Sequence, residues 1–395
     1  AGEVIDRPYS VVKELVENSI DAGADEIEIY IERGGKQLIK VVDNGCGIEK
    51  DDMRAAFFAH ATSKISTIDD IDHIHTLGFR GEALATIFSV SQVELVSAVE
   101  GQEANKVERE DEYIGKVQPT VAPKGTQVTV RNLFFNTPVR FKFMKTDKKE
   151  ESDITSFVTR YILGNPNISF RYYIDGKLAL QSYGGGLEEA IAQVYGANYL
   201  PQCFKISADR NDIKISGFIG NQNFFKANKT YQSIFLNGRY IVNNVISTAI
   251  ANAYSAYTMK RQYPFYVLNI EVPEDMVDVN VHPNKADVRF VDSGLIYGTV
   301  YKVVSSILDG SAKAAEFVVD STIVPEIKST SGNSTRSNSI YAAEFVQTQK
   351  VYDSDFSDVA GIEQFTKKKP ETDIKPSNNG ASAELKVDLS AFENY

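Results

Sequence analysis

The sequence predicts an α+β protein with two packed domains followed by a polar tail, and three observations lead to this prediction. The chain has 395 residues, 43% of them hydrophobic, whereas a single core seldom grows beyond roughly 250–300 residues. Apolar residues recur at helical spacing in some segments and alternate, as in strands, in others. Beyond about Ala315 the composition shifts towards Ser, Thr, Asn, Asp and Lys, which leaves few positions that could be buried.

Helical and strand patterns alternate along the first part of the chain. An apolar stripe predicts a helix that begins at Pro8, and Ile27, Ile29 and Ile31 alternate as in a strand. The patterns further along predict strands at 37–43, 92–98 and 125–134 and helices at 51–60 and 81–88. Between these two helices the chain is polar, and a loop of that length inside a compact domain is typically a lid or disordered.

The second part of the chain is also predicted to be α/β. A hairpin is expected around Asp175 and Gly176, which are typical turn residues. Further strands are expected at 212–220, 231–241, 264–272 and 277–290, the last interrupted by a loop, and helices at 246–257 and 295–308. We place the first domain at 1–200, with its end between 165 and 205, the second domain at 201–315, and a disordered linker at 316–395.

Composition limits the function classes. The formal net charge of −11 would repel polyanions over most of the surface, so contact with nucleic acid requires a local basic patch. Cys46 and Cys203 are too few for a disulfide framework, and a four-ligand zinc site would have to recruit histidines, of which there are four. No run approaches the roughly 18 apolar residues of a membrane span. We therefore expect an intracellular protein, cytoplasmic and nucleoid-associated if bacterial.

A glycine-rich segment, DNGCGI, runs from Asp43 to Ile48 after a predicted strand. Two glycines two residues apart let the backbone pass close to a flat ligand. A carboxylate at the strand end can accept a hydrogen bond from an exocyclic amine, which suits adenine. The segment is equally typical of a tight turn that closes a strand, and on its own it leaves both interpretations open.

A second glycine pair, Gly78 and Gly81, flanks Phe79 and Arg80 just before a predicted helix. The free N–H groups at a helix start bind phosphate well, and an arginine adds a charge-assisted contact. The alternative is an ordinary helix entry with two turn glycines. The sequence contains no GxxxxGK[ST] segment, so a nucleotide site here would be of another type.

The first helix carries polar residues opposite its apolar stripe: Glu14, Asn18 and Asp21 fall within one arc. If a triphosphate lies along this helix, the Asn18 amide oxygen can bind Mg²⁺, and Glu14 can deprotonate a water for attack on the γ-phosphate. Any isolated pair of this kind is more often a solvated face. Asp21 has no assigned role.

Together these motifs resemble the GHKL class of ATPases and, within it, the MutL family of mismatch-repair proteins. The matching blocks occur in the family's order and cover roughly residues 1–310. They are AGEVIDRPYSVVKELVENSIDAGA, VVDNGCGI, HATSKI, TLGFRGEAL, KGTQVTV, FFNTPVRFKF and VDVNVHPNK. The resemblance implies an α/β sandwich, a mixed sheet with helices on one face, followed by a smaller α/β transducer-like domain.

The resemblance implies a role for each matching position. Glu14 matches the general base and Asn18 the Mg²⁺ ligand, while Asp43 matches the carboxylate that binds the adenine amine, with Gly47 beside the base. Lys285 matches a lysine of the second domain that reaches the γ-phosphate. The remaining ATP contacts are implied for the lid, the phosphate-binding segment and one strand: Thr62, Ser63, Lys64, Gly78, Phe79, Arg80, Gly81, Glu82, Ala83, Leu84 and Thr126.

The implied activity is slow, Mg²⁺-dependent ATP hydrolysis in DNA mismatch repair, with ATP ordering the lid and the amino-terminal domains forming a homodimer. The implied partners are DNA, a mismatch-recognition protein and a downstream nuclease or helicase. The best candidate for DNA contact is a basic segment that is equally typical of a solvated helix face: Arg140, Lys142, Lys145, Lys148 and Lys149. DNA binding there should be salt-sensitive and largely independent of sequence.

An alternative from another class is a nucleotide-binding interaction module with negligible turnover. The presence of Glu14 favours the ATPase, because a module that only binds does not need a base there.

Val139 stands where the family usually has Ala, without an expected consequence. We also expect the chain to be part of a longer protein, since it begins at a helix entry without Met. An endonuclease activity of the whole protein cannot be assessed from these residues.

Overall fold

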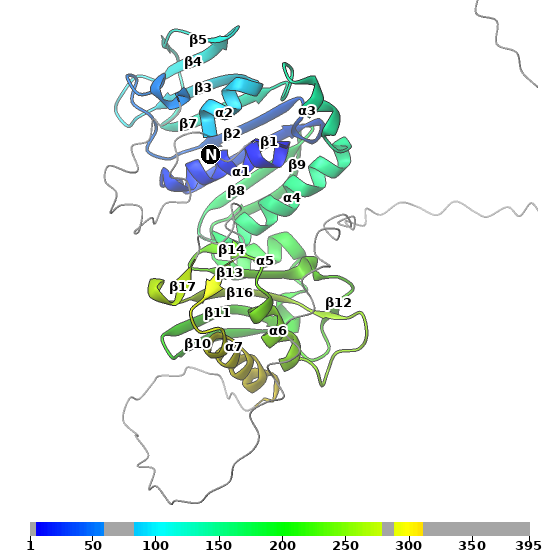
Figure 1. Cartoon of the computed structure of the whole chain (residues 1–395). Helices are drawn as coiled ribbons and strands as arrows, with labels where there is room; N and C mark the ends of the chain where they lie inside the picture. The colour runs from blue at the N-terminus through cyan, green and yellow to red at the C-terminus, as the bar shows by residue number, and fades with distance from the viewer. Residues whose placement is uncertain (1–4, 59–82, 279–287, 311–395) are drawn as a thin grey trace, which may run out of the picture. The chain divides into compact units, whose positions relative to one another are not determined.

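The computed structural model describes residues 5–58, 83–278 and 288–310 (Figure 1). Within these ranges the chain forms two larger sheets, of nine and five strands, and two small two-stranded sheets. The linker predicted at 316–395 lies outside the described residues. No helix in the described ranges is long and apolar enough to cross a membrane.

The first sheet has the strand order β5-β4-β3-β7-β2-β1-β8-β9, with β6 paired to β4. Strands β1 and β8 are parallel and their neighbours are antiparallel, so the predicted mixed sheet is confirmed. Its strands are β1 (Glu26–Glu32), β2 (Leu38–Asp43), β3 (Gln92–Ala98), β4 (Asn105–Glu110), β5 (Tyr113–Ile114), β6 (Gln118–Pro119), β7 (Gly125–Arg131), β8 (Ser169–Ile174) and β9 (Lys177–Tyr183).

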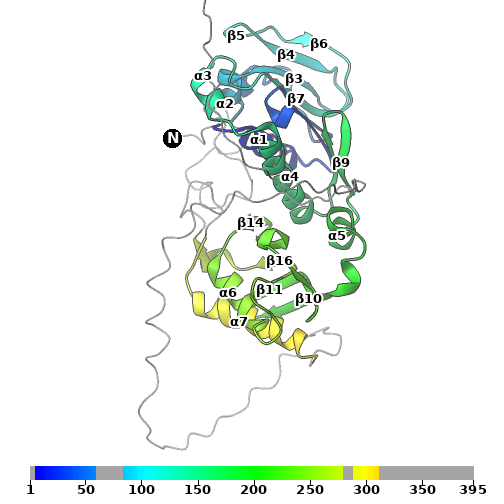
Figure 2. The ribbon, with the colours of Figure 1, turned by 90° about the vertical axis from the view of Figure 1, so that its right-hand side faces the viewer.

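The described residues of this part of the chain form the helices α1 (Pro8–Asp21), α2 (Ala83–Val90), α3 (Pro138–Phe143), α4 (Asp147–Gly164) and α5 (Leu187–Tyr195). Proline at the first position suits the start of α1, because that N–H has no partner in the helix. Helices α1 and α4 lie side by side on one face of the sheet (Figures 1 and 2). The apolar stripe of α1 is buried there, with Val11, Val12 and Val16 fully inaccessible.

The helix expected over 51–60 is wrong for its described part. Residues 51–58 form turns and a single 3-10 turn, η2 (Ala55–Phe57). Met53 and Phe57 are buried four residues apart, which is the spacing that suggested a helix. Phe58 already has an extended backbone, so the segment ends after about one turn. The other 3-10 helices are η1 (Arg33–Gly35), η4 (Leu200–Gln202), η5 (Lys229–Tyr231) and η6 (Glu274–Met276).

The second, smaller α/β part has the strand order β10-β11-β16-β13-β14, with β13 and β16 parallel. Its strands are β10 (Cys203–Arg210), β11 (Ile213–Gly220), β13 (Gln232–Leu236), β14 (Arg239–Ile241) and β16 (Tyr266–Glu271). Its helices are α6 (Asn244–Ala253) and α7 (Ser293–Leu308). The two-stranded sheets pair β12 (Phe225–Lys226) with β15 (Tyr263–Pro264), and β17 (Val277–Asp278) with β18 (Arg289–Phe290).

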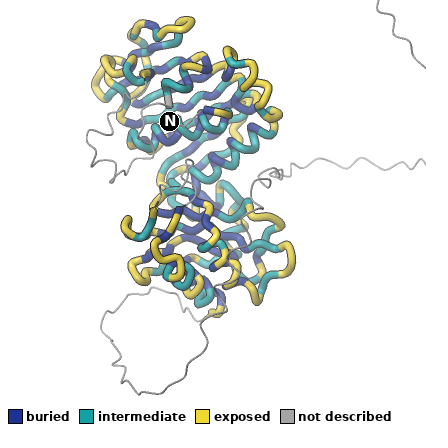
Figure 3. Tube along the Cα trace, viewed as in Figure 1, coloured by how far each residue is buried: buried dark blue, intermediate teal, exposed yellow. Residues whose placement is uncertain are grey.

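Two hydrophobic clusters meet at the second sheet, because successive side chains of a strand point to opposite faces. Phe218 and Val267 belong to the cluster that also contains the residues of α1, α4 and α5. Their neighbours Ile219 and Leu268 belong to the other cluster, with α6 and α7. Figure 3 shows buried segments running through both sheets. The domain boundary at residue 200 stays a prediction.

Candidate nucleotide-binding site

The polar face of α1 is not a solvated surface. The Glu14 side chain is only 14% exposed, and the Glu17 side chain is 11% exposed. Asn18, one turn after Glu14, is half-buried. Carboxylates in such surroundings lose solvation and need nearby polar or charged partners. This face of α1 therefore has the features of a site.

Asp43, at the end of β2, forms hydrogen bonds with residues of two other elements. Its Oδ2 accepts a hydrogen bond from the Ser19 hydroxyl of α1 at 2.8 Å. Its Oδ1 accepts from the backbone N–H of Gly45 at 2.9 Å and from that of Thr126, on β7, at 3.2 Å. Burial raises the pKa of the Asp43 carboxyl, and these three hydrogen bonds oppose that rise. The carboxylate is thus fixed between α1 and β7.

The glycines of this region pack against protein backbone. A Cβ on Gly47 would lie 2.3 Å from the carbonyl oxygen of Ala98, and one on Gly125 would lie 1.9 Å from that of Asp43. Both residues also have a positive φ, of 77° and 123°. The glycines are therefore needed for the close approach of three chain segments around Asp43, whether or not a ligand also approaches them.

Ser97, on β3, ties these segments together. Its Oγ accepts a hydrogen bond from the N–H of Ile48 and donates one to the carbonyl oxygen of Gly125, both at 2.9 Å. It also lies 3.1 Å from the Thr126 hydroxyl oxygen. Asp43, Gly47 and Thr126, predicted from different motifs, are therefore brought together at one end of α1.

Two of the remaining predicted ATP contacts lie at the start of α2, and most of the others lie outside the described residues. Leu84 is partly buried against the core at the start of α2, and Ala83 is the first residue of that helix. The following predicted residues lie outside the described ranges: Thr62, Ser63, Lys64, Gly78, Phe79, Arg80, Gly81, Glu82 and Lys285.

The basic segment divides between two surroundings. Arg140 and Lys142, on α3, are exposed, as is Lys148. The Nζ atoms of Lys145 and Lys149 each lie 3.5 Å from a carboxylate oxygen of Asp153 on α4. Helix α3 also has no buried residue and exposes three large apolar side chains, which are Val139, Phe141 and Phe143. Part of the predicted positive charge is therefore compensated within the chain.

Several residues of the site carry no recognisable signal in the sequence. Ser19 and Ser97 each hold a predicted site residue or its loop through a hydroxyl group. Tyr161, on α4, donates a hydrogen bond to Oε1 of Glu17, although the two are 144 residues apart. The contacts depend on the packing of α1 against α4 and β2 and on the pairing of β3 with β7, which a single sequence does not reveal.

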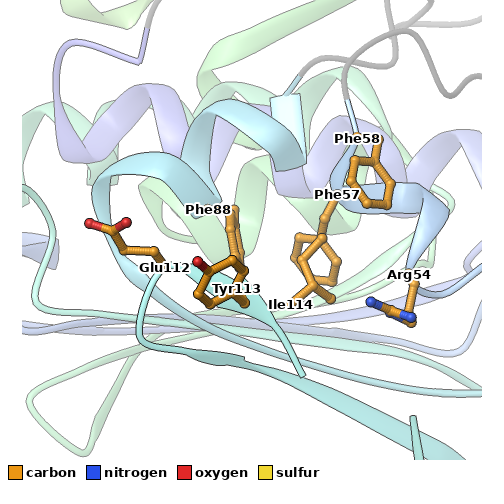
Figure 4. A pocket seen from close by; sticks show the side chains of 7 residues that line it. All are labelled: Arg54, Phe57, Phe58, Phe88, Glu112, Tyr113 and Ile114. Carbon is orange, nitrogen blue, oxygen red and sulfur yellow. The ribbon is translucent and has the colours of Figure 1, made fainter. Parts of the chain in front are cut away.

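A separate pocket of about 310 Å³ lies between η2, α2 and β5 (Figure 4). It is lined by Arg54, Phe57, Phe58, Phe88, Glu112, Tyr113 and Ile114. None of these seven residues was predicted as a site residue. Polar and apolar groups contribute alike to its wall, with Arg54 and Glu112 as the charged members.

Two family models match the chain. One, described as a histidine kinase-, DNA gyrase B- and HSP90-like ATPase, matches residues 7–131. The other, described as the C-terminal domain of DNA mismatch repair protein, matches residues 191–309. The first match includes α1, the loop after β2, and β7, which hold the site described above.

Curated relatives give the same result. DNA mismatch repair protein MutL from Clostridium botulinum (strain ATCC 19397 / Type A) is 43% identical over 315 residues, which are 79% of this chain and 47% of the relative. MutL from Staphylococcus carnosus (strain TM300) is 43% identical over 298 residues, 75% of this chain and 46% of the relative. The chain thus spans about half the length of the curated relatives it matches.

Solved structures agree with these matches. The Aquifex aeolicus MutL ATPase domain complexed with ADP has 30% identity and a TM-score of 0.52, covering 68% of this chain and 93% of that chain. A crystal structure of the N-terminal domain of a DNA repair protein has 28% identity and a TM-score of 0.67, covering 78% and 96%. The chain belongs to the MutL family of DNA mismatch repair proteins and contains the ATPase domain of that family.

Proposed function

We propose that this chain binds ATP and hydrolyses it slowly, as the ATP-driven part of a mismatch-repair protein. The observation that carries the proposal is the position of Asp43. Its carboxylate accepts a hydrogen bond from Ser19, which directly follows Asn18 on α1. The carboxylate that is proposed to bind adenine is therefore hydrogen-bonded to the helix that carries Asn18, the candidate metal ligand, and Glu14, the candidate general base.

Asp43 is suited to recognise adenine. Each carboxylate oxygen has two lone pairs, and the three protein donors leave at least one of the four for an exocyclic amine. The hydrogen bonds fix the orientation of the group before a ligand arrives, so little entropy is lost on binding. A related ATPase domain was solved with ADP, which supports a nucleotide as the ligand.

The donor set on α1 fits a magnesium ion held mainly by phosphate and water. Asn18 supplies a neutral amide oxygen from a half-buried position, and Mg²⁺ is usually bound by one or two protein oxygens together with substrate phosphates. When bound with ATP, the ion would neutralise charge that develops on the phosphates. A neutral ligand adds no negative charge beside them.

Glu14 is the proposed general base. It lies one helical turn before Asn18, so its carboxylate can orient a water near the terminal phosphate and accept the proton of that water during attack. Its side chain is 14% exposed, so a small part of it remains accessible to water.

The proposed cycle couples this chemistry to mismatch repair. ATP orders the lid and brings two amino-terminal domains into a homodimer, and hydrolysis reverses both changes. The dimer connects a mismatch-recognition protein to a downstream nuclease or helicase. Contact with DNA is assigned to the exposed basic residues Arg140, Lys142 and Lys148, assisted by Lys145 and Lys149. An affinity for DNA that does not fall with rising salt would contradict this assignment.

The ATPase rate of three variants tests the proposal. Glu14→Ala should lower kcat by about 100-fold or more, since a general base typically contributes roughly 10²–10⁴, while leaving ATP binding in place. Asn18→Ala should lose Mg²⁺-dependent ATP binding. Glu188→Ala, at an exposed surface ion pair, is the control and should behave as wild type.

Two results would contradict the proposal. Equal turnover by wild type and Glu14→Ala would exclude Glu14 as the base. ATP binding without measurable turnover in the wild type would favour the alternative, a nucleotide-binding module that acts only through its bound conformation.

A further inference from the structure

Glu14 is one of two acidic side chains on the same stretch of α1. Glu17 lies three residues further on, and residues at this spacing are neighbours on a helix. Both side chains are largely buried, at 14% and 11% exposed. Two carboxylates so close in poorly solvated surroundings repel each other. The fold must therefore place a positive charge or a hydrogen-bond donor beside this pair to keep both side chains in position.

Lys13 provides the positive charge. Its Nζ lies 3.7 Å from Oε1 of Glu14 and 4.0 Å from Oε2 of Glu17. The Lys13 side chain is itself only 21% exposed, so solvent screens these interactions less than it would at a free surface. The same ammonium group therefore attracts both carboxylates, and its distance from each one determines how strongly it attracts that carboxylate.

Tyr161, on the neighbouring helix α4, fixes the other side of Glu17. Its hydroxyl donates to Oε1 of Glu17, while Lys13 approaches Oε2. Burial raises the pKa of the Tyr161 phenol well above its ordinary value, and the negative charges of Glu17 and Glu14 raise it further. The hydroxyl therefore remains a donor at every pH at which the protein works.

The Tyr161 ring is held in place by packing. Its centroid lies 4.2 Å from that of Phe157, one turn earlier on α4, and Phe157 in turn lies 5.9 Å from Tyr9 on α1. The chain of contacts therefore begins in the interface between the two helices and ends at the Glu14 carboxylate.

We propose that Tyr161 is a positioning residue for Glu14 and acts through Glu17 and Lys13. By donating to one oxygen of Glu17, it leaves Lys13 shared between the two carboxylates and keeps the Glu14 side chain at the face of α1 where Asn18 lies. Without the hydroxyl, Glu17 attracts the Lys13 ammonium group more strongly. The attraction between Lys13 and Glu14 then becomes weaker. The inference rests on the proposed ATPase function.

Tyr161→Phe removes only the hydroxyl and is the main test. We expect kcat for ATP to fall by about three- to tenfold, a small part of the roughly 10²–10⁴ that a general base contributes. The affinity for a non-hydrolysable ATP analogue should stay within about twofold, because Glu14 acts on water rather than on the bound nucleotide. Lys13→Gln should reproduce the loss of kcat, and Lys13→Arg should largely restore turnover.

Tyr172→Phe is the matched control. Tyr172, on β8, is fully buried, whereas Tyr161 is partly buried, and the Tyr172 hydroxyl lies 3.3 Å from the Thr155 hydroxyl of the same helix, α4. If loss of a buried hydroxyl against α4 were enough to slow turnover, both variants would lose activity alike. Equal kcat in Tyr161→Phe and Tyr172→Phe, or a loss of kcat matched by a loss of analogue affinity, would overturn the proposal.

A second measurement is independent of turnover. Carboxyl ¹³C NMR of labelled glutamate reports the surroundings of Glu14, whose signal is identified by its loss in Glu14→Ala. We expect that signal to shift in Tyr161→Phe and to stay in place in Tyr172→Phe. An unmoved Glu14 signal would overturn the positioning role, whereas an inactive wild type with a shifted signal would reject only the proposed hydrolysis.

Discussion

At the scale of single residues, the Asp43 carboxylate costs stability in the folded chain. Burial is the largest influence on its pKa and raises it above the ordinary value of 3.8, in spite of three hydrogen bonds. An acid whose pKa is raised by folding binds more protons in the folded state than in the unfolded one. Its contribution to stability is therefore greatest below pH 3.8 and is lost as the pH rises through the folded pKa.

Asp43→Asn should have different effects on the stability of the protein and on its affinity for ATP. Asparagine keeps an oxygen for the N–H groups of Gly45 and Thr126, and the Ser19 hydroxyl already has a second acceptor, the carbonyl oxygen of Leu15 at 3.1 Å. We expect the Tm of the variant, relative to wild type, to rise as the pH increases from about 4 to 7. ATP affinity should fall by about tenfold or more, since the adenine amine loses its charged acceptor. A Tm difference that does not change with pH would contradict this account.

The sequence predicts the elements that carry the candidate site residues better than the residues that hold them in place. Glu14, Asn18 and Asp43 were placed on the correct elements because their residue types and spacing follow local rules. Ser19 and Tyr161 could not be predicted, since a serine inside a helix and a tyrosine in an apolar stripe are ordinary core residues. Their functions depend on which segment, distant in sequence, packs against them.

At the scale of elements, the apolar pattern of the sequence predicts a helix or strand correctly where one face of that element is buried along its length. Helix α1 and strands β1 and β2 follow their apolar periodicity closely. Strand β4 was missed because it alternates Asn105 and Val107 inside with charged residues outside, as is common near a sheet edge. Residues 51–58, the described part of the helix predicted at 51–60, do not form an α-helix, because Met53 and Phe57 have helical spacing over only one turn.

The start of α1 depends on a buried ion pair and not on a side-chain cap. Arg7, at the N-cap position, makes no capping hydrogen bond there. Its guanidinium donates to Oε2 of Glu150 at 2.9 Å and also to Asp153, both on α4. The Glu150 side chain is fully inaccessible. This contact fixes the beginning of the helix that carries Glu14 against α4, which carries Tyr161.

Arg7→Ala should destabilise the protein by about 2–4 kcal/mol, somewhat less than the roughly 3–5 kcal/mol for breaking a fully buried pair. The Arg7 side chain is 25% exposed, and this accounts for the reduction. Lys205→Ala breaks a surface pair with Glu188 at 2.9 Å and should cost about 1 kcal/mol or less. Urea unfolding of both variants checks the prediction, and equal losses would show that the burial of Glu150 is not decisive.

At the scale of the whole molecule, helix α4 touches both sheets. Its Arg160 guanidinium lies 4.4 Å from the centre of the Tyr240 ring on β14, and its last residue, Gly164, packs against Phe235 on β13. The neighbouring residue Tyr161 contacts Glu17 on α1. One helix therefore joins the surroundings of the proposed base to the second sheet, an arrangement that no local pattern in the sequence indicates.

Gly164→Ala tests how tightly this junction is packed. Alanine favours a helix over glycine by about 1 kcal/mol, but its Cβ would lie 2.5 Å from a ring carbon of Phe235. Overpacking of this kind costs about 1–3 kcal/mol, so we expect a net loss of stability in urea unfolding. Gly298→Ala, inside α7 with no atom within 4 Å of the new Cβ, should instead gain about 0.5–1 kcal/mol. If both variants gained stability, the Phe235 ring would have to move freely, and the contact between α4 and β13 would not constrain the second sheet.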